Sequence, residues 1–183
     1  MHIQLIQLYF RISATTIKGP LSNLSSATGT WVIDPSHTTI GFSVRHAMVA
    51  KVRGNFGSYA GSFTINGDNL PASAAELTIR AASINTNSAD RDGHLAAPDF
   101  LNVENFPILN FVSTAVAAKG DDIVVTGGLT IHGVTKSVHF KFEGAAKISR
   151  KDFGLVWNTV LETGGVLVGD EITLNLDVEA HKQ

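Results

Sequence analysis

The sequence predicts an all-β protein, folded as an antiparallel barrel or sandwich. Apolar residues recur at every second position in a series of short segments, which is the period of a strand buried on one face. Glycine, asparagine and aspartate turns separate these segments. Seventeen glycines, five prolines and ten phenylalanines suit a β protein with many turns. A closed sheet must fill its interior with side chains or with a ligand, and that choice decides the function.

The segment of residues 33–46, IDPSHTTIGFSVRH, is the strand that poses this question most clearly. Its two faces alternate, with Ile40, Phe42 and Val44 on one side and Gly41, Ser43 and Arg45 on the other. His46 ends the apolar row. One wall of the predicted barrel is therefore apolar and finishes in a polar group.

The same alternation continues along the chain and predicts the remaining strands. They are expected over residues 49–56, 59–66, 76–82, around 109–111, over 123–131, from 138 onward and over 172–178. Turns are expected at residues 66–68 and 119–122. The Gly-Gly pairs at 127–128 and 164–165 lie at strand boundaries and are interpreted as turns or bulges.

Residues 86–107 lack alternation and predict helices instead. Capping residues at Ser88 and at Pro98-Asp99 indicate two short helices, from about Ala89 to Ala96 and from about Asp99 to Val103. Helices inserted between strands in this way are expected to cover one end of the barrel.

Composition limits the classes of function. The chain of 183 residues fits one domain, and its net charge of −2 gives no basic field for nucleic acid. No cysteine is present, which excludes disulfides, thiolate metal sites and cysteine nucleophiles. Histidines occur in several patterned segments, but no pair has the helical i, i+4 spacing of a metal site, and no Gly-x-Ser-x-Gly motif is present. We therefore expect neither a catalytic residue nor a metal.

Residues 1–29 differ in composition from the rest, and we expect a flexible N-terminal extension before a barrel domain of residues 30–183. The stretch from Ile3 to Phe10 is too short to span a bilayer, so no integral membrane segment is expected. No lysine or arginine precedes it, as a secretory signal would require. This favours a cytoplasmic location, while a degenerate signal peptide and a periplasmic or secreted location stay open.

The sequence from Trp31 to Ala180 resembles the YceI-like family of lipid-binding proteins. The matching motifs are IDPSHTTIGFSVRH, RDGHLAAPDFLNVENFP, LTIHGVTK at residues 129–136, RKDFGLVWN and LETGGVLVGDEITLNLDVEA, in family order from Trp31 to Ala180. The resemblance implies a lipocalin-like antiparallel barrel around an elongated pocket. It also implies a soluble binder of a polyisoprenoid or isoprenoid quinone, for storage or transport, with no cofactor besides such a bound lipid.

The resemblance implies a set of ligand-binding residues. The lipid tail is expected to lie against Ile40, Phe42, Val44, Phe63, Leu77, Ile79, Phe111, Ile131 and Phe140. Polar candidates for the head group at the cavity mouth are His46, Arg91, His94 and His132, with Phe100, Leu101 and Phe106 lining the same opening. Arg91, Asp92 and His94 are the densest charged cluster, and a helix-start ion pair would explain them equally well.

Two other functions stay open. The first is an enzyme, a hydrolase or isomerase acting on an apolar isoprenoid substrate with His94 or His132 as the general base. The second is a ligand-free interaction scaffold with a packed interior. Loss of turnover on substituting either histidine would identify the enzyme, and a measured cavity volume would separate the scaffold from a lipid binder.

One departure from the family pattern concerns residues 138–148, VHFKFEGAAKI, where the family usually has a longer stretch with a hairpin. Only Gly144 interrupts this segment, so two strands are expected to be fused or shortened. The barrel then closes with a shorter wall and a smaller or leakier cavity. Alternatively, residues 145–183 pass into a second protomer and form a domain-swapped homodimer.

Overall fold

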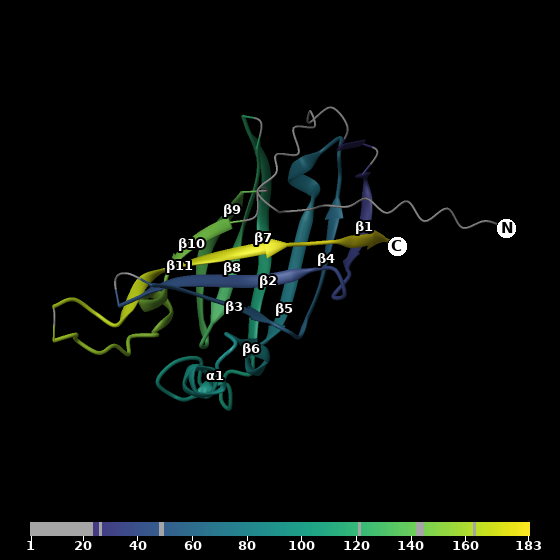
Figure 1. Ribbon diagram of the computed structural model, residues 1–183. Coiled ribbons are helices and arrows are strands. Elements are labelled where there is room, and N and C mark those ends of the chain that lie inside the picture. Colours follow the sequence, from purple (N-terminus) through teal and green to yellow (C-terminus); the bar gives the residue numbers. More distant parts are fainter. Residues whose placement is uncertain (1–23, 26, 48–49, 121, 142–144, 163) are drawn as a thin grey trace.

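The computed structural model describes residues 24–25, 27–47, 50–120, 122–141, 145–162 and 164–183. Figure 1 shows two β-sheets packed face to face, with β2 and β11 of one running across the strands of the other. The larger sheet has the order β12 (Ala180–Lys182), β1 (Gly29–Ile33), β4 (Tyr59–Ile65), β5 (Ala74–Arg80), β7 (Ile108–Lys119), β8 (Asp122–Ile131) and β9 (Val134–Lys141). The smaller has the order β10 (Ala145–Ser149), β11 (Val168–Asp177), β2 (Thr39–His46), β3 (Ala50–Phe56) and β6 (Ile84–Asn85).

Every described ladder is antiparallel. The predicted all-β antiparallel fold, with one or two short helices at one end, is therefore confirmed, and one α-helix is present in the described residues. Short 3-10 helices include η2 (Leu70–Ala72), η3 (Ala81–Ser83) and η4 (Arg150–Phe153). One large core cluster contains buried side chains from both sheets. Every second residue of a strand faces the other sheet, and in these strands the inward residues are apolar.

The helix α1 (Ala89–Ala96) has the predicted bounds, whereas the predicted second helix over residues 99–103 is wrong. Those residues form turns whose amides bond back to the end of α1, from Asn102 to the carbonyl of Ala97 (3.0 Å) and from Val103 to that of Ala96 (3.1 Å). Asn102 also has a φ of 47°, in the left-handed region. A residue in that conformation stops a right-handed helix, so the segment caps α1 rather than continuing it.

The segment of residues 138–148 contains the ends of two separate strands, so the fused strand is also wrong. β9 ends at Lys141 and β10 begins at Ala145, and they lie at the edges of different sheets. Among the described residues no ladder joins β9 to β10, and we call this open edge the seam. β10 pairs with β11, and β11 with β2, in one chain. Neither sheet therefore needs a strand from a second protomer, and the domain-swapped homodimer stays a prediction.

A buried arginine holds the segment after β10 against β11. The Arg150 side chain is 2% exposed, and its guanidinium donates to four backbone carbonyls. Nε bonds the oxygen of Gly169 (3.0 Å), Nη1 those of Trp157 (2.9 Å) and Leu155, and Nη2 that of Val168 (3.4 Å). Burial lowers the pKa of this guanidinium from its usual value. Its five N–H donors match a cluster of carbonyls that would otherwise be buried without partners.

The turn between β1 and β2 carries an ion pair. The Nδ1 atom of His37 lies 2.9 Å from a carboxylate oxygen of Asp34, whose other oxygen accepts bonds from the amide and hydroxyl of Ser36 (2.9 and 2.7 Å). These bonds, chiefly the one from His37, lower the pKa of Asp34 from 3.8 to about 2. The same contact raises the pKa of His37 above its usual 6.5. The turn is also tied to the segment between β11 and β12, because the Asp34 amide donates to the carbonyl of Glu179 (2.8 Å).

We expect Arg150→Met to destabilise the protein by about 2–4 kcal/mol, because it leaves several buried carbonyls without a donor. Urea unfolding measures this free energy. Lys151→Met is the matched control at the exposed neighbouring position, where a change within about 0.5 kcal/mol is expected. A loss below about 1 kcal/mol for Arg150→Met would contradict the structural role given to this side chain.

The Asp34–His37 pair should stabilise the turn most between about pH 4 and 6.5. The lowered pKa of Asp34 gives a contribution that is present above 3.8 and lost as the pH falls toward about 2. The raised pKa of His37 gives a contribution that is complete below 6.5 and lost as the pH rises through the folded-state value. NMR titration of His37 tests this pairing, with its pKa expected to fall toward 6.5 in Asp34→Asn. Identical titration in both proteins would refute it.

Candidate functional site: an apolar cavity between the sheets

A cavity of about 230 Å³ lies between the two sheets, and its wall is almost wholly apolar. The larger sheet contributes side chains from β4, β5, β7 and β8, and the smaller sheet from β2, β3 and β11. These are inward positions of alternating strands, so the pattern that builds the core also builds the cavity wall. A concave apolar space with few polar groups is typical of a site for an apolar small molecule.

Seven of the nine side chains predicted to contact a lipid tail line this cavity. They are Ile40, Phe63, Leu77, Ile79, Phe111, Ile131 and Phe140. The rings of Phe111 and Phe140 meet edge to face with centroids 5.1 Å apart. Gly127 allows this position, because a Cβ there would lie 2.5 Å from the Phe111 ring and 2.4 Å from the carbonyl oxygen of Val112. The binding role of these residues stays a prediction.

Phe42 and Val44 do not line the cavity. The Phe42 ring packs against Phe56, with centroids 5.7 Å apart, and lies over the backbone of Gly54. A Cβ at Gly54 would come within 2.5 Å of that ring, so the glycine provides the space that the ring occupies. Val44 lies further along β2, paired with Val52 and Ile172.

Several lining residues were absent from the predicted set. Most of them lie on the apolar faces of strands, including Ile33, Phe56, Val116, Ile123, Val125, Leu174 and Leu176. The period of two is the signal that could have found these. Leu24 and Leu70 also line the cavity but belong to no alternating segment, so the sequence carries no comparable signal for them.

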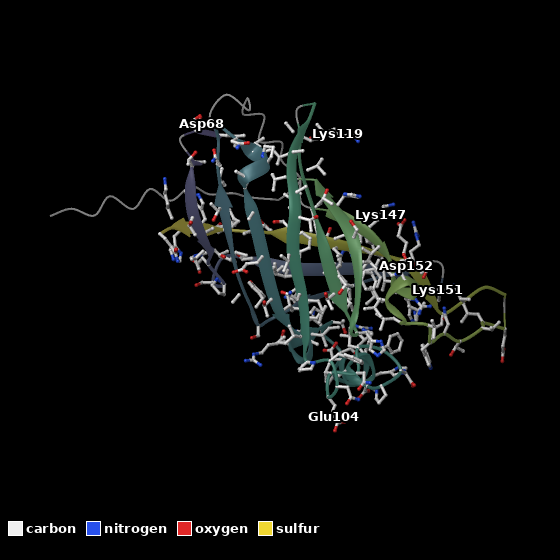
Figure 2. All side chains as sticks on the ribbon, turned by 180° about the vertical axis from the view of Figure 1, so that it is seen from behind. Asp68, Glu104, Lys119, Lys147, Lys151 and Asp152 are labelled. Atoms are coloured by element: carbon white, nitrogen blue, oxygen red, sulfur yellow. The ribbon has the colours of Figure 1, made fainter. Side chains whose placement is uncertain are left out.

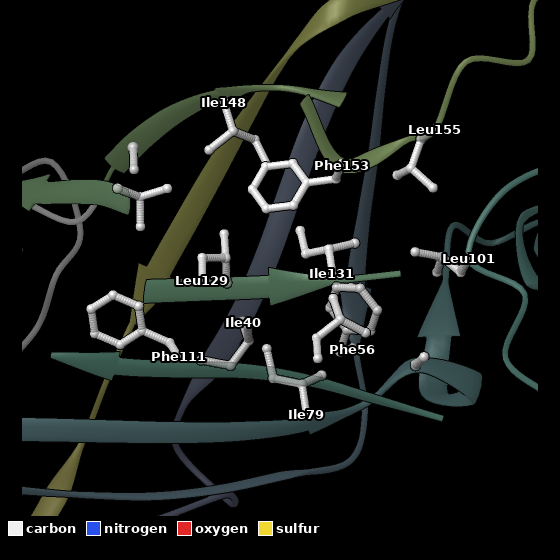
Figure 3. Close-up of a cluster of buried hydrophobic side chains, with 14 of the residues drawn as sticks. Ile40, Phe56, Ile79, Leu101, Phe111, Leu129, Ile131, Ile148, Phe153 and Leu155 are labelled. Atoms are coloured by element: carbon white, nitrogen blue, oxygen red, sulfur yellow. The ribbon is translucent and has the colours of Figure 1, made fainter. Parts of the chain in front are cut away.

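The two ends of the cavity differ. At the end next to α1, here called the closed end, Phe153 is 1% exposed and packs with Leu101 and Leu155 in the core (Figure 3). At the opposite end, here called the open end, half-exposed Leu24, Leu70 and Ser73 line the cavity. Figure 2 shows Asp68 and Lys119, in the turns at the open end, on the opposite side of the molecule from Glu104 near α1. The cavity lining therefore reaches the open end, whereas Phe153, Leu101 and Leu155 belong to the packed core near α1.

Arg91 and Asp92, at the start of α1, are engaged with a neighbouring turn. Arg91 donates from Nε to the hydroxyl of Thr86 and from Nη2 to its carbonyl, both at 2.7 Å. Asp92 accepts a bond of 2.9 Å from the Thr86 amide. Both side chains are thus bonded to Thr86, and the helix-start ion pair stays a prediction.

The three histidine candidates also lie outside the cavity wall. The His94 ring meets Phe100 and Trp157 edge to face, with centroid distances of 5.0 and 4.7 Å. His132, with a φ of 52° in the β8–β9 turn, packs against Phe106 at 4.5 Å. His46 is half-buried at the end of β2.

Phe100, Leu101 and Phe106, the apolar candidates for the mouth, do not line the cavity either. Phe100 and Leu101 are buried near α1, and the Phe106 ring covers Gly133. The structure therefore gathers most of the predicted mouth residues near the closed end. Their part in binding stays a prediction.

The polar side chains of the strands and turns that form the cavity already have partners, and the Ser62–Glu76 pair is exposed. The Ser62 hydroxyl donates to the carboxylate of Glu76 at 3.1 Å, and the Ser73 hydroxyl accepts from the amide of Asn66 at 2.9 Å. In the part of the chain that the structure describes, no three His, Asp or Glu side chains gather closely enough to hold a metal ion. Within that same part, no helix has the length and apolar character needed to cross a membrane.

Residues 31–180 match the family model described as the YceI-like domain. UPF0312 protein PA0423 of Pseudomonas aeruginosa is 37% identical over 164 residues, covering 80% of this chain and 83% of that protein. Protein YceI of Salmonella newport is 34% identical over 164 residues, with the same coverage.

Solved structures agree with the sequence comparisons. BcnA of Burkholderia cenocepacia superposes with a TM-score of 0.68 at 22% identity, over 80% of this chain and 98% of that one. The YCEI protein of Campylobacter jejuni superposes with a TM-score of 0.62 at 29% identity, over 82% of this chain and 96% of that one. A polyisoprenoid binding domain from Saccharophagus degradans, implicated in plant cell wall breakdown, superposes with a TM-score of 0.61 at 13% identity, over 84% of this chain and 98% of that one. The motifs, the crossed antiparallel sheets and these matches together establish that the chain belongs to the YceI-like family.

Proposed function

We propose that this protein binds an isoprenoid lipid in the cavity between its sheets and stores or transports it. The apolar cavity carries this proposal, because its wall offers an almost wholly apolar surface to a hydrocarbon tail. Membership of the YceI-like family and similarity to a polyisoprenoid binding domain support an isoprenoid as the ligand class. A polyisoprenoid or an isoprenoid quinone would both present such a tail.

Burial of the tail supplies the binding free energy. Each CH₂ group removed from water contributes about 0.8 kcal/mol, so a tail segment binds without any covalent step. Phe63 and Phe111 give the wall large apolar surfaces, and Ile40 faces them from the smaller sheet. Aromatic and branched aliphatic side chains of this kind suit a methyl-branched hydrocarbon.

The polar chemistry around the cavity favours binding over catalysis. Glu76 is the titratable residue among those that line the cavity, and it accepts a bond from Ser62. His94 and His132, the candidate bases for an enzyme, pack against aromatic rings outside the wall. A general base must come within about 3 Å of the proton that it removes. A substrate in this cavity would not meet either histidine in that way.

Solvent extraction of the purified protein followed by mass spectrometry should find an isoprenoid. Ala75→Trp, which places an indole in the cavity from β5, should reduce the bound lipid about tenfold or more, the equivalent of about two buried CH₂ groups. Thr78→Trp makes the same substitution at an exposed position of β5 and should leave the bound amount within about twofold.

His94→Ala and His132→Ala are expected to retain the lipid, and thermal melts should verify that every variant is folded. A folded Ala75→Trp protein that holds as much lipid as the wild type would rule out this cavity as the site. A protein that is empty as purified and ignores added isoprenoid would instead favour the interaction scaffold.

A further inference from the structure

We infer that the protein docks on the surface of an anionic lipid bilayer through one end of the smaller sheet. The docking surface consists of the projecting hairpin, residues 156–162 and 164–167, and of the basic residues on the adjoining ends of β2 and β3. It lies outside the cavity, so the inference does not depend on what the cavity holds.

Exposed apolar side chains gather on the projecting hairpin. Val156, Val160 and Val166 are 66%, 78% and 41% exposed, and they are three of the five large hydrophobic residues exposed in the described part of the chain. An isolated antiparallel bridge pairs Val160 with Val166, so these two side chains share one face. Figure 1 shows the hairpin at the left, projecting beyond the ends of β2 and β3. Apolar side chains grouped in this way mark an interaction surface.

Hydrogen bonds give the hairpin a defined shape although it covers no core. The Leu167 amide donates to the carbonyl of Thr159 at 2.8 Å. At the base, the Asn158 side chain donates to the Val168 carbonyl (2.7 Å) and accepts from the Val168 amide (3.0 Å). The valines are therefore held away from the sheets rather than folded back onto them.

Three basic residues without acidic partners lie beside the hairpin. Arg45 on β2 is directly opposite Lys51 on β3, and Arg53 follows two residues later on the same face. All three side chains are exposed, and in the described part of the chain none of them lies within ion-pair distance of a carboxylate. Like charges directly opposite each other on a sheet repel, and a nearby anionic surface would relieve that repulsion.

The hairpin and the basic residues are joined directly. The amide of Ala47, just after β2, donates to the carbonyl of Leu167 at 2.7 Å. A Cβ at Gly169, just after the hairpin, would lie 3.3 Å from the Cβ of Arg45. The apolar and the cationic parts therefore belong to one rigid end of the molecule.

Two acidic residues of β11 are bonded to β10, on the side of β11 away from β2. Glu171 is paired with Lys147 at 2.9 Å, and Asp170 accepts a bond from the Ser149 hydroxyl at 2.8 Å. Glu162 is different, because it is exposed in the hairpin itself. Its carboxylate opposes docking on an anionic surface, so removing that charge should strengthen docking.

The two parts together fit a lipid surface. Apolar side chains gain free energy by entering the boundary between head groups and acyl chains, and lysine and arginine are attracted to anionic head groups. The projecting valines supply the first contribution and the unpaired cations of β2 and β3 the second. Charge complementarity thus favours an anionic bilayer over a second copy of this chain, whose matching surface would be cationic as well.

Co-sedimentation of the full-length protein with vesicles tests this inference. The probes are vesicles of phosphatidylcholine with about 40% phosphatidylglycerol and vesicles of phosphatidylcholine alone, both free of isoprenoid. At about 50 mM salt we expect binding to the anionic vesicles to be about tenfold tighter than to the neutral ones. At about 500 mM salt the difference should shrink to within about twofold, because salt screens the attraction.

Charge substitutions test the cationic part. The double variant Arg45→Gln/Lys51→Gln should bind the anionic vesicles about tenfold or more weakly. Lys136→Gln is the matched control at an exposed position of β9 and should stay within about twofold of the wild type. Glu162→Gln should bind about threefold more tightly, since it removes the opposing charge.

Apolar substitutions test the hairpin. The double variant Val160→Ser/Val166→Ser should bind the anionic vesicles about tenfold more weakly. Val112→Ser is the matched control, because Val112 is 48% exposed on β7, and it should stay within about twofold. Thermal melts verify that each variant is folded, and size-exclusion chromatography with light scattering gives its mass without vesicles.

Three results would overturn the inference. They are equal or absent binding to the two kinds of vesicle, a folded double variant that binds as the wild type does, and a valine variant that converts a dimer into a monomer. None of them bears on the proposed function, because the vesicles contain no isoprenoid and the bound lipid is extracted from protein alone. A protein that docks as expected but never holds an isoprenoid would overturn only the proposed function.

Discussion

Two crossed sheets that bury their apolar faces against each other are the constraint on which the rest of this protein depends. Each strand sends every second side chain inward, so the interior is apolar throughout. Whether a region of the interior is filled or hollow then depends on how many side chains point into it. Phe153, Leu101 and Leu155 add to the strands next to α1, and the interior there is filled. Beside this filled region a cavity remains between the sheets, and its lining extends to Leu24 and Leu70 at the other end.

Arg150 makes the filled half possible. Residues 154–158 belong to no helix or strand, and a buried irregular segment leaves carbonyls without partners. The guanidinium supplies donors to those carbonyls and also to the start of β11. Phe153 and Leu155, on either side of Gly154, can therefore point into the core while their backbone stays hydrogen-bonded. A charged side chain thus supports the most apolar part of the molecule.

The features that depend on alternation could be predicted from the sequence. The end at which the barrel opens and the local backbone conformation could not. Ile40, Phe63 and Phe111 could be assigned to an interior wall because the period of two fixes their face. That pattern is the same at both ends of a strand, so it could not tell which end of the barrel is open. The charged residues near α1 were therefore expected at a mouth that lies elsewhere.

Local conformation accounts for the other differences. The left-handed backbone of Asn102 and the position of the Phe42 ring over Gly54 both depend on tertiary contacts.

The seam between β9 and β10 also affects contacts between molecules. Edge strands with unpaired backbone groups are templates for strands of other chains, and charged side chains on an edge discourage such pairing. β10 carries exposed Lys147, paired with Glu171 at 2.9 Å, and β9 carries exposed Lys136. Charged side chains in these positions discourage pairing of the seam with strands of other chains.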